Sequence, residues 1–159
     1  MPHPSFPPDQ ATYLHPVVFG SVYWVNFTYP DLPAGVEERR ILSWRPALVI
    51  SSTVFAKYAG VLNVLPMAAY KGKLRPYHHL LLKSEYPLLD GDSLVKTELV
   101  YPLLRMSLPD QHYICRLHEH DLAAVLRKLA DTLCITAYYE LREPTDMEPA
   151  LPPTLPEAE

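Results

Sequence analysis

The stretch SWRPALVISS (residues 43–52) places an arginine directly before a proline, at the start of a β-favouring apolar run. Because proline restricts the preceding residue to extended backbone, we expect Arg45 at the mouth of a buried strand over 46–52. Its guanidinium is always charged and binds two phosphate or carboxylate oxygens at once. The stretch therefore predicts a core strand that carries a rigidly placed cation.

Six further runs, rich in apolar and β-favouring residues, surround this strand and are separated by turn residues. They cover residues 17–27, 60–66, 77–83, 92–96, 99–105 and 111–117. Pro102 predicts an edge strand or a bulge, since proline cannot donate to a sheet ladder. We therefore expect seven short strands, mostly antiparallel.

One segment has helical periodicity instead. It starts at Asp121, a candidate N-cap, and ends before Pro144. Its apolar residues form a single stripe: Leu122, Val125, Leu126, Leu129 and Leu133. The pattern predicts a mainly β fold with a C-terminal α-helix laid across a small barrel or sandwich.

The prolines gather at the two ends of the chain, with five of the 18 in residues 1–16 and five in 144–156. Pro-rich, charge-biased segments bury too little apolar surface to offset their ordering entropy. We therefore expect a Pro-rich N-terminal tail (1–16), a folded domain (17–142) and an acidic, Pro-rich C-terminal tail (143–159).

Composition indicates a globular protein that acts in the cytoplasm. Hydrophobic residues make up 48% of the 159 residues, but no apolar run approaches the ~20 residues that span a membrane, and the start of the chain lacks the features of a signal peptide. The two cysteines, Cys115 and Cys134, lack the spacing of a redox or metal motif and are predicted to be buried free thiols.

The net charge of −4 conceals an asymmetry. Residues 140–159 hold six acids and one arginine, whereas residues 39–105 hold ten basic residues against four acids, a balance of +6. A basic middle segment favours a polyanionic partner. Solvated lysines that protect strand edges from pairing are the alternative explanation.

Six segments, taken in order, resemble the MazF/PemK family of toxin endoribonucleases. They are GSVYWVNF (20–27), WRPALVISS (44–52), VLNVLPM (61–67), HHLLLK (78–83), SLVKTELVYPLLR (93–105) and HDLAAVLRKLADTL (120–133). The resemblance implies a compact SH3-like barrel of the MazF/PemK/CcdB type that forms homodimers. It also implies metal-independent cleavage of single-stranded RNA, mRNA above all, restrained by a cognate acidic antitoxin protein.

In that family the arginine of the Arg-Pro pair is catalytic, and Arg45 matches it. A fixed cation there would stabilise the charge that gathers on the phosphoryl oxygens when a ribose 2′-hydroxyl attacks. A structural ion pair with Glu37 or Glu38 is the alternative. The family's catalytic threonine corresponds to Ala68, which has no hydroxyl.

Three residues are candidates to replace that threonine. His78 and His79 carry proton-transfer chemistry, but adjacent strand residues point to opposite faces, so only one can reach a site. Ser51 offers a hydroxyl, although serine here more often caps a turn. Either the protein cleaves RNA with a different second residue, or it has kept the fold and lost the reaction.

RNA binding is expected from the basic middle of the chain. Aromatic and cationic side chains in one loop suit base stacking and backbone contacts; the candidates are Tyr70, Lys71, Lys73, Arg75, Lys57 and Lys96. An exposed hairpin kept soluble by its lysines is the alternative.

The motif RLHEHDL (116–122) places His118 and His120 around Glu119, but the sequence offers no third convincing ligand, so we expect no metal and no cofactor. Two further functions stay open. One is a catalytically inactive MazF-like domain that binds RNA or protein, and the other is a protein-interaction barrel without a nucleic-acid role.

Overall fold

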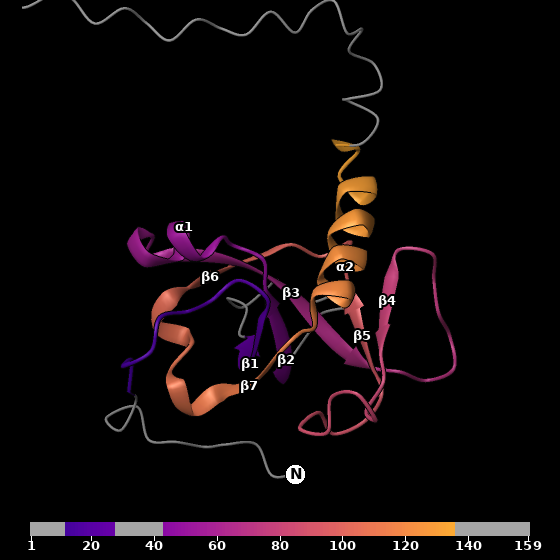
Figure 1. Ribbon diagram of the computed structural model, residues 1–159, viewed down its shortest axis with the longest axis horizontal. Coiled ribbons are helices and arrows are strands. Elements are labelled where there is room, and N and C mark those ends of the chain that lie inside the picture. The colour runs from indigo at the N-terminus through magenta and orange to yellow at the C-terminus, as the bar shows by residue number, and fades with distance from the viewer. Residues whose placement is uncertain (1–11, 28–42, 136–159) are drawn as a thin grey trace, which may run out of the picture.

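The computed structural model describes residues 12–27 and 43–135, which form a curled antiparallel sheet with a C-terminal helix (Figure 1). The strands are β1 (Ser21–Phe27), β2 (Ser43–Val49), β3 (Val61–Ala69), β4 (His78–Leu81), β5 (Ser93–Lys96), β6 (Tyr101–Leu104) and β7 (Tyr113–Arg116). The helices are α1 (Thr53–Tyr58) and α2 (Glu119–Thr132), with short 3-10 helices at Arg105–Ser107 and Asp110–His112. The predicted mainly β fold with a C-terminal helix is confirmed.

The strand order is β4-β5-β3-β2-β1-β7, and β6 also pairs with β3. Successive parts of β3 serve different neighbours: Val61–Val64 pairs with β6, Val64–Pro66 with β2, and Met67–Ala69 with β5. A nine-residue strand that changes partners along its length curls the sheet. Within the described residues β6 pairs with β3 alone, so the edge position predicted from Pro102 is confirmed.

The sheet is apolar on both faces. Alternation along β1 sends Val22 into one core cluster, and Tyr23 and Val25 into the other. The first cluster includes Leu122 and Val125 of α2, which packs against β4. α2 therefore covers one face, as the apolar stripe predicts, while α1 lies at the end of the molecule away from β4 (Figure 1).

The ends of the helices differ from the sequence prediction. α2 begins at Glu119 with His118 at the N-cap position, so the expectation that Asp121 caps the helix is wrong. The Asp121 side chain is turned inward and accepts hydrogen bonds from His79 and the Tyr86 hydroxyl. The short helix α1 was not predicted; the Ser52 side chain caps it by accepting from the Phe55 N–H at 3.1 Å.

The cysteines are both free thiols, but only one is shielded. Cys115 on β7 is half-buried, and burial raises its pKa to about 11. Cys134 follows α2 and is exposed, so the prediction of two buried thiols is wrong for this residue. It lies past the last turn of the helix, where the apolar stripe no longer faces the sheet.

Residues 12–16 lie against the domain although their composition predicted a tail. The Leu14 N–H donates to Asp110 at 2.7 Å, and the Tyr13 hydroxyl donates to the Met106 carbonyl at 2.5 Å. These bonds fasten the segment beside the two 3-10 helices. No helix of the described residues is long and apolar enough to cross a membrane.

Candidate active site

A pocket of about 230 Å³ opens where β1, β2 and β3 meet the residues leading into β5. It is lined by Trp24, Trp44, Arg45, Pro46, Met67, Ala68, Ala69, Asp90, Gly91, Asp92 and Ser93. The volume suits a single base or phosphate group. Arg45 and Ala68, the matching and departing positions of the resemblance, lie in this one pocket.

Arg45 owes its position to pairing between β1 and β2. It is the third residue of β2 and lies opposite Val25, because the ladder continues to the Phe27–Ser43 pair. The guanidinium therefore projects from within a strand, two residues after the strand begins. It is half-buried, which restricts water around any group that it contacts.

Ala68 reaches the pocket from β3, where it pairs with Leu94 of β5. It is partly exposed and offers only a methyl group. A side chain one or two atoms longer here would enter the space that Arg45 lines. The fold thus juxtaposes the two positions, while the sequence provides a hydrogen-bonding group at only one of them.

Two aspartates line the pocket. Asp90 and Asp92 belong to the connection between β4 and β5, which Lys83 organises. The Lys83 N–H donates to the Asp92 side chain at 2.8 Å, and its ammonium donates to the carbonyls of Leu89 and Asp90 at 2.9 and 3.0 Å.

Neither aspartate was predicted as a site residue; Asp92 was expected only as the first residue of a strand over 92–96. The antiparallel pairing of β5 with β3 brings this segment to the pocket, since the Ala69–Ser93 pair places the residues before β5 just beyond the end of β3. The Tyr70 N–H donates to the Asp92 carbonyl at 2.9 Å and continues this contact past the end of β3.

Two indoles complete the pocket. Trp24 of β1 lies opposite Pro46, and Trp44 of β2 lies opposite Asn26. Both are half-buried, so part of each side chain is accessible. Neither was predicted as a site residue: Trp24 lies in the predicted strand 17–27, and Trp44 was quoted only for the resemblance. Indole faces beside a cation are suited to stacking with bases.

The other catalytic candidates lie outside the residues that line this pocket. The His78 ring is within 3.1 Å of Glu98, and the His79 ring is within 2.6 Å of Asp121. His78 pairs with Lys96, at the opposite end of β5 from Ser93. Ser51 is buried and accepts the Asn63 N–H at 2.8 Å, so it holds β3 beside the end of β2.

Comparison with family models matches residues 19–133 to the PemK-like, MazF-like toxins of type II toxin-antitoxin systems. The chain belongs to this family. Comparison with curated protein sequences gives no match.

Solved structures that are similar to this chain agree with it in fold. MazF from Deinococcus radiodurans has a TM-score of 0.58 at 20% identity, over 76% of this chain and 98% of that one. A MazE-MazF structure from the same organism scores 0.57 at 22% identity, with the same coverage. An endoribonuclease in complex with its cognate antitoxin, from a mycobacterial species, scores 0.55 at 16% identity, over 76% and 96%. The predicted MazF-like barrel is confirmed.

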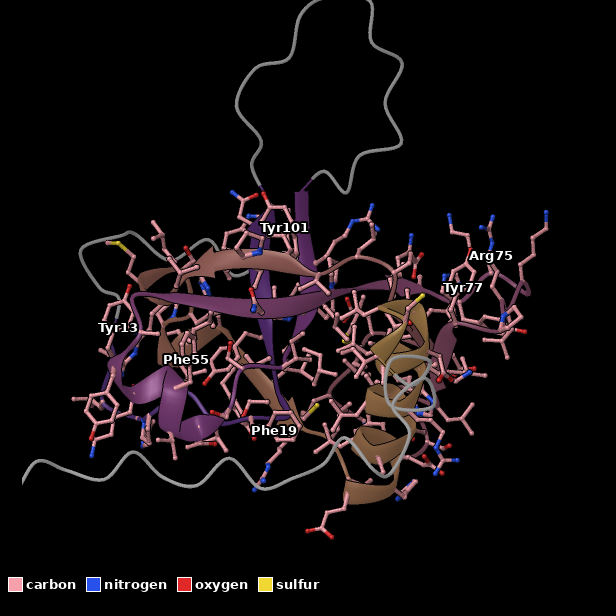
Figure 2. All side chains as sticks on the ribbon, turned by 90° about the horizontal axis from the view of Figure 1, so that it is seen from above. Tyr13, Phe19, Phe55, Arg75, Tyr77 and Tyr101 are labelled. Carbon is pink, nitrogen blue, oxygen red and sulfur yellow. The ribbon has the colours of Figure 1, made fainter. Side chains whose placement is uncertain are left out.

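The basic residues predicted to bind RNA are spread over several parts of the fold. Lys71 and Lys73 are exposed in the β3–β4 connection, directly after the pocket residues Ala68 and Ala69. Arg75, further along, donates to the Tyr77 hydroxyl at 2.5 Å, and Figure 2 shows this pair at the end of the molecule away from Tyr13 and Phe55.

The remaining two lysines are more distant in the fold. Lys57 lies on α1, where its carbonyl is 3.4 Å from the Arg105 guanidinium. Lys96 ends β5 at the opposite end from the pocket residue Ser93. Lys71 is therefore the predicted RNA-binding lysine nearest in sequence to the pocket, two positions after Ala69.

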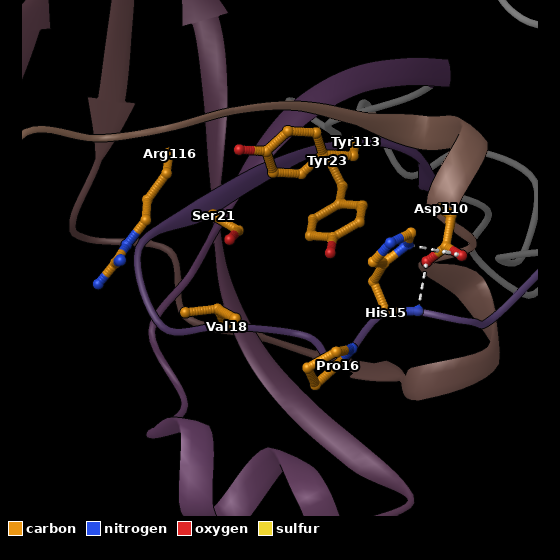
Figure 3. Close-up of a pocket in the computed structure, with 8 residues that line it drawn as sticks. All are labelled: His15, Pro16, Val18, Ser21, Tyr23, Asp110, Tyr113 and Arg116. Atoms are coloured by element: carbon orange, nitrogen blue, oxygen red, sulfur yellow. Dashed lines mark hydrogen bonds and ion pairs between the residues drawn. The ribbon is translucent and has the colours of Figure 1, made fainter.

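A larger pocket of about 500 Å³ lies on the other side of β1 (Figure 3). Tyr23 lines it while Trp24 lines the Arg45 pocket, and successive strand residues point to opposite faces. Burial, with the Asp110 carboxylate nearby, raises the pKa of Tyr23. The walls are mostly apolar, and Arg45 is not among the lining residues. The larger volume is therefore no reason to place the functional site in this pocket.

Proposed function

We propose that this chain is the toxin of a type II toxin-antitoxin system and a metal-independent endoribonuclease that cleaves single-stranded RNA. One observation carries the proposal: the family's arginine, Arg45, lines a pocket together with two indoles and two aspartates. This combination supplies a cation for phosphate, faces for bases and carboxylates for proton transfer.

The chemistry is internal transesterification. The ribose 2′-oxygen attacks the adjacent phosphorus, and Arg45 stabilises the negative charge that develops on the phosphoryl oxygens. The bond from phosphorus to the 5′-oxygen breaks, and that oxygen takes a proton from solvent. The products are a 2′,3′-cyclic phosphate and a 5′-hydroxyl.

A base must accept the 2′-hydroxyl proton. Asp92 already accepts the Lys83 N–H and fixes the turn, so we assign the base to Asp90. His78, His79 and Ser51 are engaged in contacts elsewhere in the fold and have no part in this assignment.

Binding follows from the surroundings of the pocket. We propose that Trp24 and Trp44 stack with bases while Lys71 and Lys73 contact the phosphates on either side. We also propose that the toxin works on cytoplasmic mRNA as a homodimer and that an acidic antitoxin covers its basic segment, as the family suggests.

Ala68 favours a second candidate, a domain that binds RNA without cutting it. Every group needed for stacking and phosphate contact is retained in this case, and only the hydrogen-bonding side chain of β3 is missing. Both proposed functions use the same pocket, and they differ only in whether the bound RNA is cleaved.

The test is incubation of the purified chain with a long mixed-sequence RNA in EDTA, followed by mapping of the new ends. We expect 2′,3′-cyclic phosphate and 5′-hydroxyl ends, lost in Arg45→Ala and retained in Arg127→Ala, a matched change on the exposed side of α2. Cleavage that needs added divalent metal contradicts the mechanism. Salt-sensitive binding without cleavage supports the second candidate instead.

A further inference from the structure

The strongest group of metal-ligating side chains in the described residues lies away from the Arg45 pocket, at the start of α2. Ligand atoms of Glu85, His120 and Asp121 all lie within 4.8 Å of one another. The sequence motif around His120 lacked a third ligand. The fold supplies Glu85 from the β4–β5 connection, and it turns Asp121 inward instead of leaving it at the helix cap.

Asp121 is held as the central member of this group. The residue is 5% exposed, and its carboxylate accepts the His79 ring N–H at 2.6 Å on one oxygen and the Tyr86 hydroxyl on the other. The His120 Nε2 atom lies 3.3 Å from the second oxygen. Hydrogen bonds of this kind fix ligating carboxylates in metal sites, where the outer groups orient the inner ones.

His120 has an oriented ring although most of its side chain is exposed. The imidazole of His118 stacks on it at a centroid distance of 5.7 Å and an interplanar angle of 11°. Tyr86 lies beside His118 at 5.1 Å, and its hydroxyl accepts the His118 backbone N–H at 3.0 Å. One tyrosine thus positions both the carboxylate and the stacked histidines.

We propose that Glu85, His120 and Asp121 bind a divalent transition-metal ion, with Zn²⁺ as the preferred ion. An imidazole nitrogen with two carboxylate oxygens is a ligand set that suits Zn²⁺, whereas Mg²⁺ and Ca²⁺ favour oxygen ligands alone. Water completes the coordination, since Glu85 and His120 are both exposed.

The proposed ion has a structural role that is separate from RNA cleavage. It joins the first turn of α2 to the β4–β5 connection, whose other end contributes Asp90 and Asp92 to the Arg45 pocket. Metal binding to the native state alone stabilises the fold. The proposal does not rest on the endoribonuclease assignment, because cleavage through Arg45 requires no metal.

The test uses the full chain with any affinity tag removed, titrated with Zn²⁺ by calorimetry and by competition with a chromophoric chelator. We expect one saturable site per chain and a melting temperature that rises with Zn²⁺ but not with equimolar Mg²⁺. His120→Ala and Glu85→Gln, both exposed, should each weaken Zn²⁺ affinity at least about tenfold. Glu119→Gln is the matched control, being the neighbouring exposed acid outside the group.

Three outcomes overturn the proposal: no saturable binding, affinity that is unchanged in His120→Ala and Glu85→Gln, or an equal loss in Glu119→Gln. RNA cleavage in EDTA is measured on the same preparations. If the protein binds Zn²⁺ but does not cleave RNA, the metal site stands and the proposed function fails. If it cleaves RNA but does not bind Zn²⁺, the proposed function stands and the metal site fails.

Discussion

Arg45 and Ala68 line the same pocket from neighbouring strands, although 23 positions separate them in the chain. Antiparallel pairing of β2 with β3, from Ala47–Pro66 to Val49–Val64, sets their relative position. A cation therefore faces an alanine methyl where the family's pattern places a hydroxyl. The two proposed functions, cleavage of RNA and binding without cleavage, differ at this position.

Restoring the hydroxyl tests that point. Ala68→Thr should raise RNA cleavage by about tenfold or more, since one aligned hydrogen bond in a transition state contributes about 1.4 kcal/mol or above. Ala68→Val has the same branched shape without the hydroxyl and should leave the rate unchanged. Initial rates on a fluorogenic RNA measure both. Equal rates for the two variants would show that another group already has this role.

Lysines beside the pocket should govern affinity rather than chemistry. Lys71→Ala and Lys73→Ala should each weaken RNA binding and reduce the slope of log K against log salt by about 0.7 for every lost phosphate contact. Fluorescence anisotropy between low and moderate salt measures the slope, with Arg127→Ala as the control. An RNA affinity that changes neither with salt nor with these substitutions would contradict a nucleic-acid role and favour a protein-interaction barrel.

Gly20 is expected to be the most sensitive glycine of the described residues. Its φ of +83° is strained for other residues, and an added Cβ would lie 2.7 Å from Leu122 Cδ1. Its backbone also joins β2 to the segment before α2, through bonds to Val49 and Leu117. Gly20→Ala should lower the free energy of unfolding by roughly 1–3 kcal/mol in urea denaturation. Gly60→Ala meets no atom within 4 Å and should change it little.

The two thiols should react at different rates. Burial raises the pKa of Cys115 to about 11, so almost none is thiolate at pH 8, whereas Cys134 is exposed. Iodoacetamide labelling followed by mass spectrometry should modify Cys134 in the native protein and both residues after denaturation. Rapid native labelling of Cys115 would contradict the packing of β7 described here.

Asp110 should make the attachment of residues 12–16 sensitive to acid. Burial would raise the pKa of Asp110, but hydrogen bonds from the Leu14 N–H and from His15 outweigh this and lower it below the ordinary 3.8. A lowered carboxylate pKa stabilises the contact above pH 3.8, and the stabilisation is lost as the pH falls through the lowered value.

Hydrogen exchange at the Leu14 amide measures this attachment. Protection should persist from neutral pH down to about pH 4 and fall below it, after correction for intrinsic rates. Asp110→Asn should show faster exchange already at pH 7, whereas Glu119→Gln should match the unmodified chain. Protection that survives in Asp110→Asn would assign the attachment to the Tyr13–Met106 bond instead.

Much of the fold was predictable because short-range chemistry fixes it. Strand periodicity located all seven strands, and the stripe from Leu122 to Leu129 located α2. Tertiary contacts decided two other features. Pairing with β1 starts β2 at Ser43, three residues before the predicted start at Pro46, and the bond to His79 turns the Asp121 side chain inward. Neither the Phe27–Ser43 pair nor the His79–Asp121 bond can be inferred from the residues that neighbour them in the sequence.

The sequence alone determined the family and the barrel with its helix, and it singled out Arg45 and Ala68 as candidate site positions, because these depend on residue type and order. Only the tertiary structure decided which groups accompany them. Asp90 and Asp92 join the pocket through the pairing of β5 with β3, and Glu85 joins His120 through the packing of α2 against β4. Such contacts bring together side chains tens of positions apart, and the free energy that fixes them comes from burial of the whole core rather than from the residues themselves.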